Sequence, residues 1–457
     1  GDKRQSVSLC LLLIVRNEEE SLQAHLPLWR DVADCFVIGI DDRTTDGTTS
    51  RIHQVLGDHA SRFVFFFTFQ DFAQARNAVL RATAQNFPNT SHIIFADADW
   101  RPELKTVDKS ELDFVHGFFP FVVWDHSGHT SRLLGWMARF DEHLKFKHRQ
   151  DGHYSATAAS TLPTKVVGWE MQVVESASNW NVNLHGHSRS SDRFLFDLNL
   201  LELDLEDDPT DLHTLFYLGI TKFAYIESLM GKGTHEKTPE LDAVVNSGMF
   251  YLDRAVDLHG DLRNSEYVWG AKRWLAYGYY YFLGDPEKAE RAYEGCIEYD
   301  PVRVDCVIFL SRLYLETGNL NAAWDKAMMG LLHRPMTGHV LTYFYTFECF
   351  VPTQAAFVIS TRISTPESHG DDSIEGLLTL GWYLVRHVRD QCNHGVMVDS
   401  PEDIDSLESL FEGAIARQGI NVEEMKQAAL LNDPESLLAL LLGTWGTGAK
   451  ASSTSSP

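Results

Sequence analysis

The chain has 457 residues, of which 44% are hydrophobic and 12% aromatic, so it can bury substantial cores and is not disordered as a whole. Its net charge of −25 argues against nucleic-acid binding, which usually needs a basic surface, and against docking on anionic membranes. At about 150 residues per domain, this length predicts two or three domains.

The acidic residues are spread unevenly. Residues 1–193 carry 20 Lys and Arg against 24 Asp and Glu, whereas residues 194–457 carry 19 against 40. We expect a nearly neutral first body, residues 1–193, and a strongly acidic second body, residues 194–446. The last stretch, residues 447–457, is rich in Gly, Ser and Thr and is predicted to be disordered.

The cysteines and the apolar runs bear on the compartment. Six cysteines form no CxxC pair, so buried reduced thiols are expected rather than a zinc site or a disulfide framework. No apolar run reaches the roughly 18 residues that a membrane span needs. We expect a cytoplasmic protein. Because the chain starts with Gly rather than Met, the Golgi or ER lumen is the alternative if an N-terminal anchor has been removed.

The first 115 residues alternate between short apolar runs and helical patterns. The predicted strands are 8–15, 35–40, 63–67 and 92–96, and the clearest predicted helices are 19–29 and 72–85. This order predicts an α/β, Rossmann-like domain with a mostly parallel sheet and helices on both faces. Residues 118–124 and 132–140 read as further elements, and we expect residues 116–193 to complete the same sheet.

Polar clusters follow three of the predicted strands. They are Arg16-Asn17-Glu18, Asp41-Asp42 and the pair Asp97 and Asp99. The carboxyl ends of parallel strands share one edge, which is where open α/β sheets bind ligands. The three clusters therefore predict a binding site at that edge.

Helical patterns dominate from Phe194 onward, and two stretches match at a spacing of 34 residues. Tyr280, Gly284, Ala289 and Pro301 pair with Tyr314, Gly318, Ala323 and Pro335. A 34-residue helix–turn–helix repeat with these residue types resembles the tetratricopeptide (TPR) repeat. The second body is therefore predicted to be an all-α, TPR-like repeat domain.

Asp97 and Asp99 are the sharpest chemical signal. Two carboxylates one residue apart, after a buried strand, can hold Mn²⁺ or Mg²⁺ together with phosphate oxygens. No GxxxxGK[ST] motif occurs, and no GxGxxG opens a helix after a strand. Phosphate binding through a metal is therefore favoured over a glycine-rich loop.

Four short motifs occur in a specific order: IVRNEE (Ile14–Glu19), DDRTTDGT (Asp41–Thr48), QARN (Gln74–Asn77) and FADADW (Phe95–Trp100). Together they resemble the family 2 glycosyltransferases with the GT-A fold, over roughly residues 8–135. The segment Asn183–Gly219 resembles the junction in members with C-terminal TPR repeats, some of which glycosylate peptides or proteins.

The resemblance implies roles for individual residues. Six residues would line the nucleotide pocket: Arg16, Asn17, Glu18, Asp41, Asp42 and Arg76. Among them, Asp41 would accept an N–H from the edge of a uracil-type base. Asp97 would meet the ribose or metal-bound water, and Asp99 would coordinate the metal. His185, with His187 as its rival, would add a metal or diphosphate contact.

Two arginines and one tryptophan carry open alternatives. Arg189 and Arg193 would hold the diphosphate, or else form ion pairs on a helix surface. Trp100, where many relatives have an acidic residue, would stack on a sugar face or pack in the core.

The sequence departs from the family pattern at the catalytic base. Relatives often show a His-Glu pair after an aromatic and basic stretch, and here that region reads FKHRQDGHY (Phe146–Tyr154). The candidate bases are Asp151 first, then Glu170, then His153, each with a solvated loop position as the alternative.

These features predict an inverting, metal-dependent glycosyltransferase that uses a UDP-sugar, with guanine as the other base. A protein or peptide acceptor would be recruited by the repeats, unless the repeats instead form a homodimer interface. The competing hypothesis is a non-catalytic TPR adaptor with a degenerate glycosyltransferase domain. A membrane polysaccharide synthase would share the nucleotide motifs but needs spanning helices that are absent from this sequence.

Overall fold

The computed structural model describes residues 7–57, 59–124, 131–134, 136–141, 144–150, 154–155, 164–174, 191–230, 238–262, 265–332, 351–365, 374–392 and 401–417. The chain forms two compact units. The first holds the described residues up to Gly284, and the second holds those from Asp285 on. The predicted boundary at residue 194 falls inside the first unit and stays a prediction.

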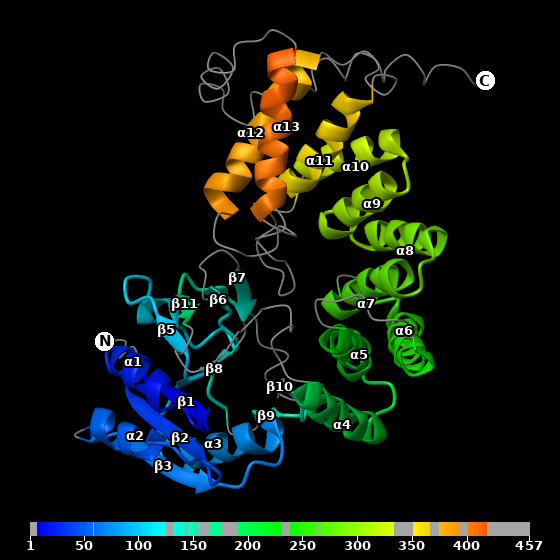
Figure 1. Ribbon diagram of the computed structural model, residues 1–457. Coiled ribbons are helices and arrows are strands. Elements are labelled where there is room, and N and C mark those ends of the chain that lie inside the picture. The colour runs from blue at the N-terminus through cyan, green and yellow to red at the C-terminus, as the bar shows by residue number, and fades with distance from the viewer. Residues whose placement is uncertain are drawn as a thin grey trace. The chain divides into compact units, whose positions relative to one another are not determined.

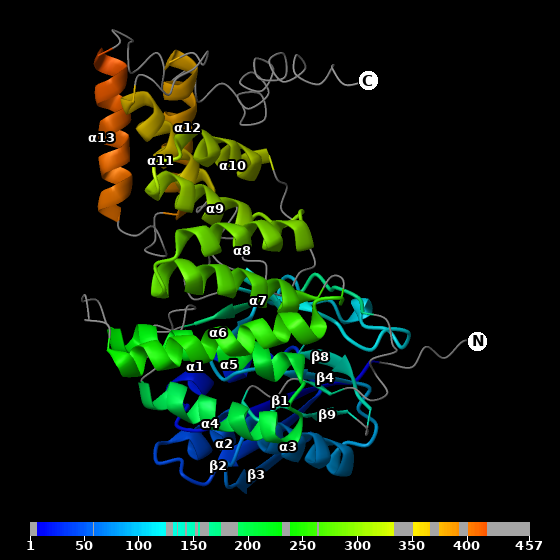
Figure 2. The same cartoon turned by 90° about the vertical axis from the view of Figure 1, so that its right-hand side faces the viewer.

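The first unit is built on a five-stranded sheet in the order β3-β2-β1-β4-β8 (Figures 1 and 2). Its strands are β1 (Leu9–Val15), β2 (Cys35–Asp41), β3 (Arg62–Phe67), β4 (His92–Phe95) and β8 (Met137–Arg139). The first four run parallel and β8 is antiparallel to β4. The prediction of an α/β domain with a mostly parallel sheet is confirmed.

The alternation of side chains along β1 explains why helices cover both faces of this sheet. Leu9, Leu11 and Leu13 face one core, which also holds apolar side chains from α1 (Glu19–Trp29) and α2 (Thr48–Leu56). Cys10 and Leu12 face the other core, with α3 (Phe72–Asn86). Such a strand is buried on both faces and reads as a continuous apolar run.

The expectation that residues 116–193 complete the main sheet holds for β8, which joins it, but not for the other described strands of this stretch. A separate four-stranded sheet has the order β5-β11-β6-β7. Its strands are β5 (Trp100–Pro102), β6 (Phe121–Trp124), β7 (Ser131–Leu134) and β11 (Glu170–Val173), and β9 (Lys145–Phe146) pairs with β10 (Tyr154–Ser155) in a third, two-stranded sheet. A one-turn 3₁₀ helix, η1, spans Lys109–Glu111.

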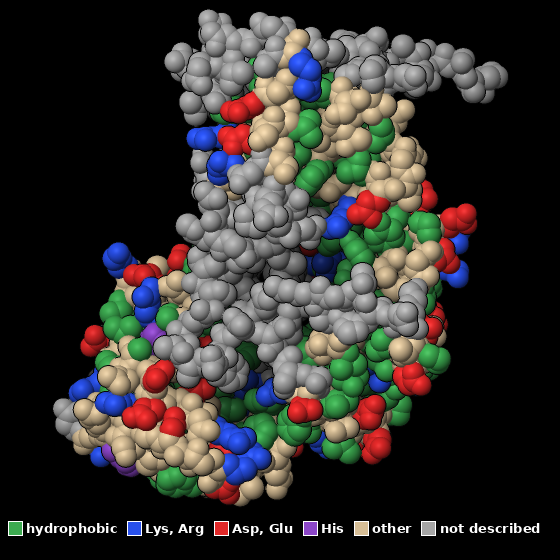
Figure 3. All heavy atoms as spheres, in the orientation of Figure 1, with side chains coloured by type: hydrophobic (Ala, Val, Ile, Leu, Met, Phe, Trp, Pro, Cys, Tyr) green, Lys and Arg blue, Asp and Glu red, His purple; other side chains and the backbone are tan. Residues whose placement is uncertain are grey.

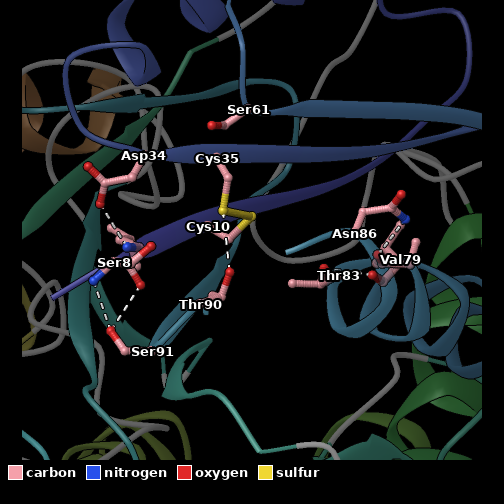
Figure 4. Close-up of a disulfide and its surroundings, with 12 residues drawn as sticks. Ser8, Cys10, Asp34, Cys35, Ser61, Val79, Thr83, Asn86, Thr90 and Ser91 are labelled. Carbon is pink, nitrogen blue, oxygen red and sulfur yellow. Dashed lines mark hydrogen bonds between the residues drawn. A yellow bond between two sulfur atoms is a disulfide. The ribbon is translucent and has the colours of Figure 1, made fainter. Parts of the chain in front are cut away.

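The expectation of reduced thiols is wrong for four cysteines. Cys10 on β1 and Cys35 on β2 are opposite each other in the parallel pair and form a disulfide, beside the Thr90 hydroxyl (Figure 4). Cys296 and Cys306 form a second disulfide in the second unit. The sequence shows no motif for either pair, because their spacings of 25 and 10 residues carry no recognisable pattern.

All the longer elements described after residue 190 are helices. The first unit ends with α4 (Ser191–Asp207), α5 (Leu212–Met230), α6 (Pro239–His259), α7 (Glu266–Tyr277) and a π-helical segment, η3 (Gly278–Phe282). The second unit contains α8 (Pro286–Tyr299), α9 (Asp305–Glu316), α10 (Leu320–Leu332), α11 (Val351–Ser364), α12 (Ile374–Cys392) and α13 (Pro401–Arg417). The prediction of a helical C-terminal region is confirmed.

The 34-residue spacing corresponds to equivalent structural positions. Gly284 precedes α8 and Gly318 precedes α10, with φ of 65° and 81°, a conformation that favours glycine. Ala289 and Ala323, five residues beyond each glycine, are fully buried. Pro335 and the predicted tail, residues 447–457, lie outside the described residues.

The described surface carries charges of both signs. Figure 3 shows Lys and Arg side chains interspersed with Asp and Glu, rather than a continuous basic field. Among the helices that the structure describes, none combines the length and the apolar character needed to cross a membrane.

Candidate functional site

The strand order places the polar clusters around one point of the main sheet. From β1 the chain continues to β2 and β3 on one side, and β4 lies on the other side of β1, which makes the carboxyl ends of β1 and β4 the topological switch point. The loop after β1 carries Arg16, Asn17 and Glu18, and the loop after β4 carries Asp97 and Asp99. Asp41 is the last residue of β2, on the other side of β1.

The loops after β1 and β2 are tied together by hydrogen bonds. Asn17 has a φ of 55°, a left-handed conformation that Asn tolerates better than most residues. Its side-chain Oδ1 accepts a hydrogen bond from the Thr45 backbone N–H at 2.8 Å. The Thr48 hydroxyl in turn accepts one from the Glu18 backbone N–H at 2.7 Å. These hydrogen bonds fix the backbone of the loop after β1 against the loop after β2.

Asp46 strengthens this link between the two loops. Its Oδ1 accepts hydrogen bonds from the backbone N–H and the hydroxyl of Thr48, the first residue of α2. Its Oδ2 accepts one from the Glu19 backbone N–H at 3.1 Å.

Asp41 is buried and paired with two arginines. Arg43 donates from Nε to Oδ1 at 3.0 Å and from Nη2 to Oδ2 at 2.8 Å, and Arg16 Nε lies 3.8 Å from Oδ2. Burial alone would raise the pKa of Asp41, but hydrogen bonds from Arg43 and the charges of both arginines lower it below its usual value. Asp41 is therefore ionised at neutral pH.

Carboxylates from three loops gather at the switch point. Asp97 is exposed, Asp99 is half-buried, and Glu18 is half-buried. The pKa of Glu18 is raised first by burial and then by the negative charges of Asp97 and Asp46. This concentration of negative charge favours the binding of a cation.

Trp100, the residue after Asp99, belongs to the core. Its side chain is 2% exposed and stacks on Trp136, with the ring centroids 5.4 Å apart. Its carbonyl accepts a hydrogen bond from the indole N–H of Trp29. Of the two alternatives for this residue, the structure supports core packing, because no face of the ring is left for a sugar.

Two of the predicted arginines are held by aromatic rings. Arg76 on α3 is 5% exposed, and its guanidinium lies over the rings of Trp136 at 4.3 Å, Phe146 at 5.3 Å and Phe72 at 5.6 Å. Arg193 on α4 donates from Nε to Asp197 Oδ1 at 3.0 Å and lies over Phe72 at 5.1 Å. The two roles considered for Arg193 are a diphosphate contact and an ion pair on a helix, and the structure shows the ion pair.

The other predicted residues are bonded to further parts of this unit or lie outside the described residues. Asp42 is exposed and accepts a hydrogen bond from the Thr68 hydroxyl. Glu170 on β11 accepts one from the Trp124 indole N–H at 3.0 Å. Five predicted residues lie outside the described residues: Asp151, His153, His185, His187 and Arg189.

Sequence reasoning missed two features of this unit. Arg43 lies within the quoted DDRTTDGT motif but was assigned no role, although a cation two residues after a strand-end carboxylate is a readable signal. His148, Asp211 and His213 form the one trio of potential metal ligands, among the described residues, whose ligand atoms all lie within 4.8 Å of one another. Their separation in sequence hides this cluster.

The comparisons with known proteins are weak. No family model matches the chain, and no curated protein matches it. Among solved structures, the chain resembles MamA at 13% identity, covering 50% of this chain and 92% of MamA, with a TM-score of 0.27. It resembles TTC0263, a thermophilic TPR protein of Thermus thermophilus, at 15% identity, covering 32% of this chain and 86% of that one, with a TM-score of 0.21.

A third solved structure is similar over more of the chain. Residues 1–349 of S. aureus TarS show 10% identity, covering 63% of this chain and 92% of that one, with a TM-score of 0.34. All three TM-scores are low, so the functional argument rests on the geometry of the site.

Proposed function

We propose that the first unit is an inverting, metal-dependent glycosyltransferase that uses a UDP-sugar donor. The observation that carries this proposal is that three neighbouring parallel strands each carry an ionisable group at their carboxyl ends, Asp41 as the last residue of β2, Glu18 after β1 and Asp97 after β4, with the switch point between β1 and β4. Open α/β sheets bind ligands, nucleotides among them, outside the carboxyl ends of the strands at such a point.

The donor nucleotide would lie across the ends of β1 and β2. The ionised Asp41 carboxylate can accept the N3–H of uracil. Arg16, whose side chain is 53% exposed, carries positive charge beside it that favours a diphosphate. The backbone links from Asn17 to Thr45 and from Glu18 to Thr48 keep this surface preorganised.

Asp99 and Asp97 would hold the divalent cation, Mn²⁺ or Mg²⁺. These ions prefer carboxylate oxygens. Burial is the main cause of the raised pKa of Glu18, and the negative charges of Asp97 and Asp46 raise it further, which supports a cation at this position. When bound, the ion would neutralise charge on the diphosphate leaving group.

The reaction is a single displacement. The acceptor oxygen forms a bond to the anomeric carbon while the bond from that carbon to the diphosphate oxygen breaks, so UDP leaves and the configuration inverts. A carboxylate takes the acceptor proton. Asp151 is the proposed base, with His153 as its rival.

Glu170 is the weaker base. Val173 pairs with Trp100 and Met171 with Pro102, so Glu170 lies beyond Pro102, about 10 Å along the strand from the residue that follows Asp99. Its carboxylate is already bonded to Trp124. A base must lie within hydrogen-bond reach of the acceptor, which this position does not favour.

The helical region would recruit the acceptor. Helix–turn–helix units with equivalent glycines at 284 and 318 fit a TPR-like array, and such arrays bind peptides or proteins. The excess of Asp and Glu after residue 193 favours a basic acceptor. Alternatively, the same helices would form the interface of a homodimer.

One observation favours a non-catalytic adaptor as the second candidate. Arg43 occupies both oxygens of Asp41, the group that would read the base. A degenerate donor site could close in this way, and the helical repeats would then carry the function alone.

The two disulfides bear on the compartment. Disulfides are rare in cytoplasmic proteins and persist in oxidising compartments. We therefore favour the Golgi or ER lumen over the cytoplasm.

The proposed reaction is tested by incubating the whole chain with a panel of UDP-sugars and Mn²⁺ and following UDP release and product configuration by NMR. Metal-dependent release with an inverted product supports the proposal. Retention of configuration would contradict the single displacement, and no release from any donor, with or without basic peptides, would favour the adaptor.

A further inference from the structure

Three consecutive basic residues, Lys147, His148 and Arg149, contact the acidic corner between α4 and α5. The acidic partners are Asp204, Asp207, Asp208 and Asp211. We call these seven residues the clasp. The contacts join residues 55 to 64 positions apart, all within the first unit.

Arg149 makes the shortest ion pairs of the clasp. Its Nη1 lies 2.7 Å from Asp204 Oδ1 and its Nη2 lies 2.6 Å from Asp207 Oδ2. Its backbone N–H also donates to Asp204 Oδ2 at 2.9 Å. The Asp204 side chain is only 7% exposed, so its charge depends on this partner.

Lys147 and His148 add a second arm through Asp211. Lys147 Nζ lies 3.0 Å from Oδ1, and His148 Nε2 lies 3.0 Å from Oδ2. Oδ2 also accepts from the Thr214 backbone N–H at 2.8 Å, which caps the start of α5. The first turn of α5 is thereby linked to the chain that leaves β9.

The trio His148, Asp211 and His213 meets the distance criterion for a metal site, but its arrangement fits the clasp better. The two imidazole rings stack with centroids 3.9 Å apart and 21° between their planes, so their in-plane nitrogen lone pairs lie in two separate, nearly parallel planes, which does not favour both binding one ion. Lys147 already neutralises Asp211.

Residues 146–149, which carry the basic half of the clasp, also bond to the first turns of α3. The Arg149 carbonyl accepts a hydrogen bond from the Phe72 backbone N–H at 2.9 Å, and Phe72 is the first residue of α3. The Phe146 backbone is bonded through both its N–H and its carbonyl to the Asn77 amide, at 2.8 and 2.9 Å. Phe72 and Phe146 are two of the three rings around the Arg76 guanidinium.

We propose that the Arg149–Asp204 pair is a positioning element of the donor site, which makes the α4–α5 corner part of the support of that site. The pair fixes residues 146–149 to α4, and the same residues bond to α3 at Phe72 and Asn77. The rings of Phe72 and Phe146 lie beside the Arg76 guanidinium at these contacts, so a shift of the segment would move them. Arg76 is one of the six residues that the resemblance to family 2 glycosyltransferases assigns to the nucleotide pocket, so this inference rests on the proposed function.

The test is UDP affinity, measured by calorimetry with Mn²⁺ on the full chain. Arg149→Ala should weaken UDP binding about tenfold, and Asp204→Asn should do the same. Arg149→Lys keeps the charge but loses the paired geometry and should give a smaller loss. The matched control is Lys109→Ala, which breaks an exposed ion pair with Asp34 beside the first residue of β1, at the amino end of the strands.

A double-variant cycle separates positioning from a general effect on folding. If Arg149 acts through Arg76, Arg149→Ala should cause little further loss in an Arg76→Ala background. Full additivity of the two losses would overturn the proposal. If the single variants Arg149→Lys and Asp204→Asn both bind UDP with wild-type affinity, the proposal is also overturned. This test remains available even if Arg149→Ala does not fold.

Two other outcomes are distinct from these. Absence of UDP binding by the wild-type chain would refute the proposed function itself, whatever the clasp does. A rise in thermal midpoint with Zn²⁺ alone that disappears in His213→Ala would overturn the assignment of this corner to the clasp and make it a metal site.

Discussion

The guanidinium of Arg43 forms two hydrogen bonds with the carboxylate of Asp41, at 3.0 and 2.8 Å, at the carboxyl end of β2. The pair keeps a buried carboxylate ionised where a nucleobase would be read. Under the proposed function, a uracil that binds here would compete with Arg43 for Asp41 or share it, and the two residues together would set the strength of base recognition.

Asp41→Asn should weaken UDP binding by about 10- to 100-fold, because a hydrogen bond to a charged group contributes about 1.5–3 kcal/mol. Asparagine has the same shape but loses the charge that orders Arg43. Calorimetric titration checks this, with Asp31→Asn, an exposed aspartate after α1, as the control. Equal affinities of Asp41→Asn and wild type would remove Asp41 from the donor site.

Asp99→Asn should lower the rate of sugar transfer about 100-fold or more, and Asp97→Asn should lower it less, since Asp99 is the proposed metal ligand. The rate is followed as UDP release at saturating Mn²⁺. Glu20→Gln, an exposed carboxylate on α1, serves as the control. Near-normal transfer by Asp99→Asn would show that the metal assignment is wrong.

Trp100→Ala should lower the free energy of unfolding by about 3–5 kcal/mol, as expected for the loss of a buried aromatic side chain. Trp100→Phe should lose less, because the ring contacts with Trp136 and Phe121 are partly kept. Urea denaturation followed by circular dichroism measures both. Unchanged stability with lost donor binding would instead mean that Trp100 stacks on the sugar.

The close approach of α5 and α6 depends on glycine. A Cβ at Gly248 would lie 2.8 Å from a ring carbon of Phe223 and 3.2 Å from the Gly219 carbonyl oxygen. Gly248→Ala should therefore lower the free energy of unfolding by about 1–3 kcal/mol. Gly295→Ala in α8, where a Cβ meets nothing within 4 Å, should be neutral or stabilising. Thermal melts of the two variants distinguish packing from helix propensity.

Asp211 should make stability depend on pH. Burial alone would raise the pKa of its carboxyl, but hydrogen bonds from His148 and Thr214 lower it below the usual value. An acid whose folded pKa is lowered stabilises the fold above its unfolded pKa of about 3.9 and loses that contribution as pH falls. Asp211→Asn should therefore be less stable than wild type by about 2 kcal/mol at pH 7.

This difference between Asp211→Asn and wild type should shrink below about pH 4. Urea denaturation at several pH values measures it. A difference that stays constant down to pH 3 would mean that the ionised form of Asp211 is not what stabilises the fold.

The sequence predicts the main sheet well because its strands are short, apolar and buried on both faces. The run ending at Val15 and the run beginning at Cys35 need no distant information to be recognised. The equivalent glycines Gly284 and Gly318 could also be predicted from local sequence, because a residue in the left-handed conformation at the end of a helix is usually glycine.

The second sheet and the clasp could not be predicted in the same way. Strands β5 and β11 are three and four residues long, and their pairing joins Trp100 to Val173 across 73 positions. The contact between Arg149 and Asp204 is equally non-local. A tryptophan such as Trp100 can either stack on a sugar or pack in a core, and only its burial in the structure distinguishes the two roles.

The central claim is that the strand ends form a working donor site, and the most direct measurement is calorimetric titration of UDP and of GDP, each with Mn²⁺ and with chelator. The account predicts saturable binding of UDP with Mn²⁺, loss of that binding with chelator or in Asp99→Asn, and much weaker binding of GDP. Absence of metal-dependent binding of either nucleotide would contradict the account and favour the adaptor.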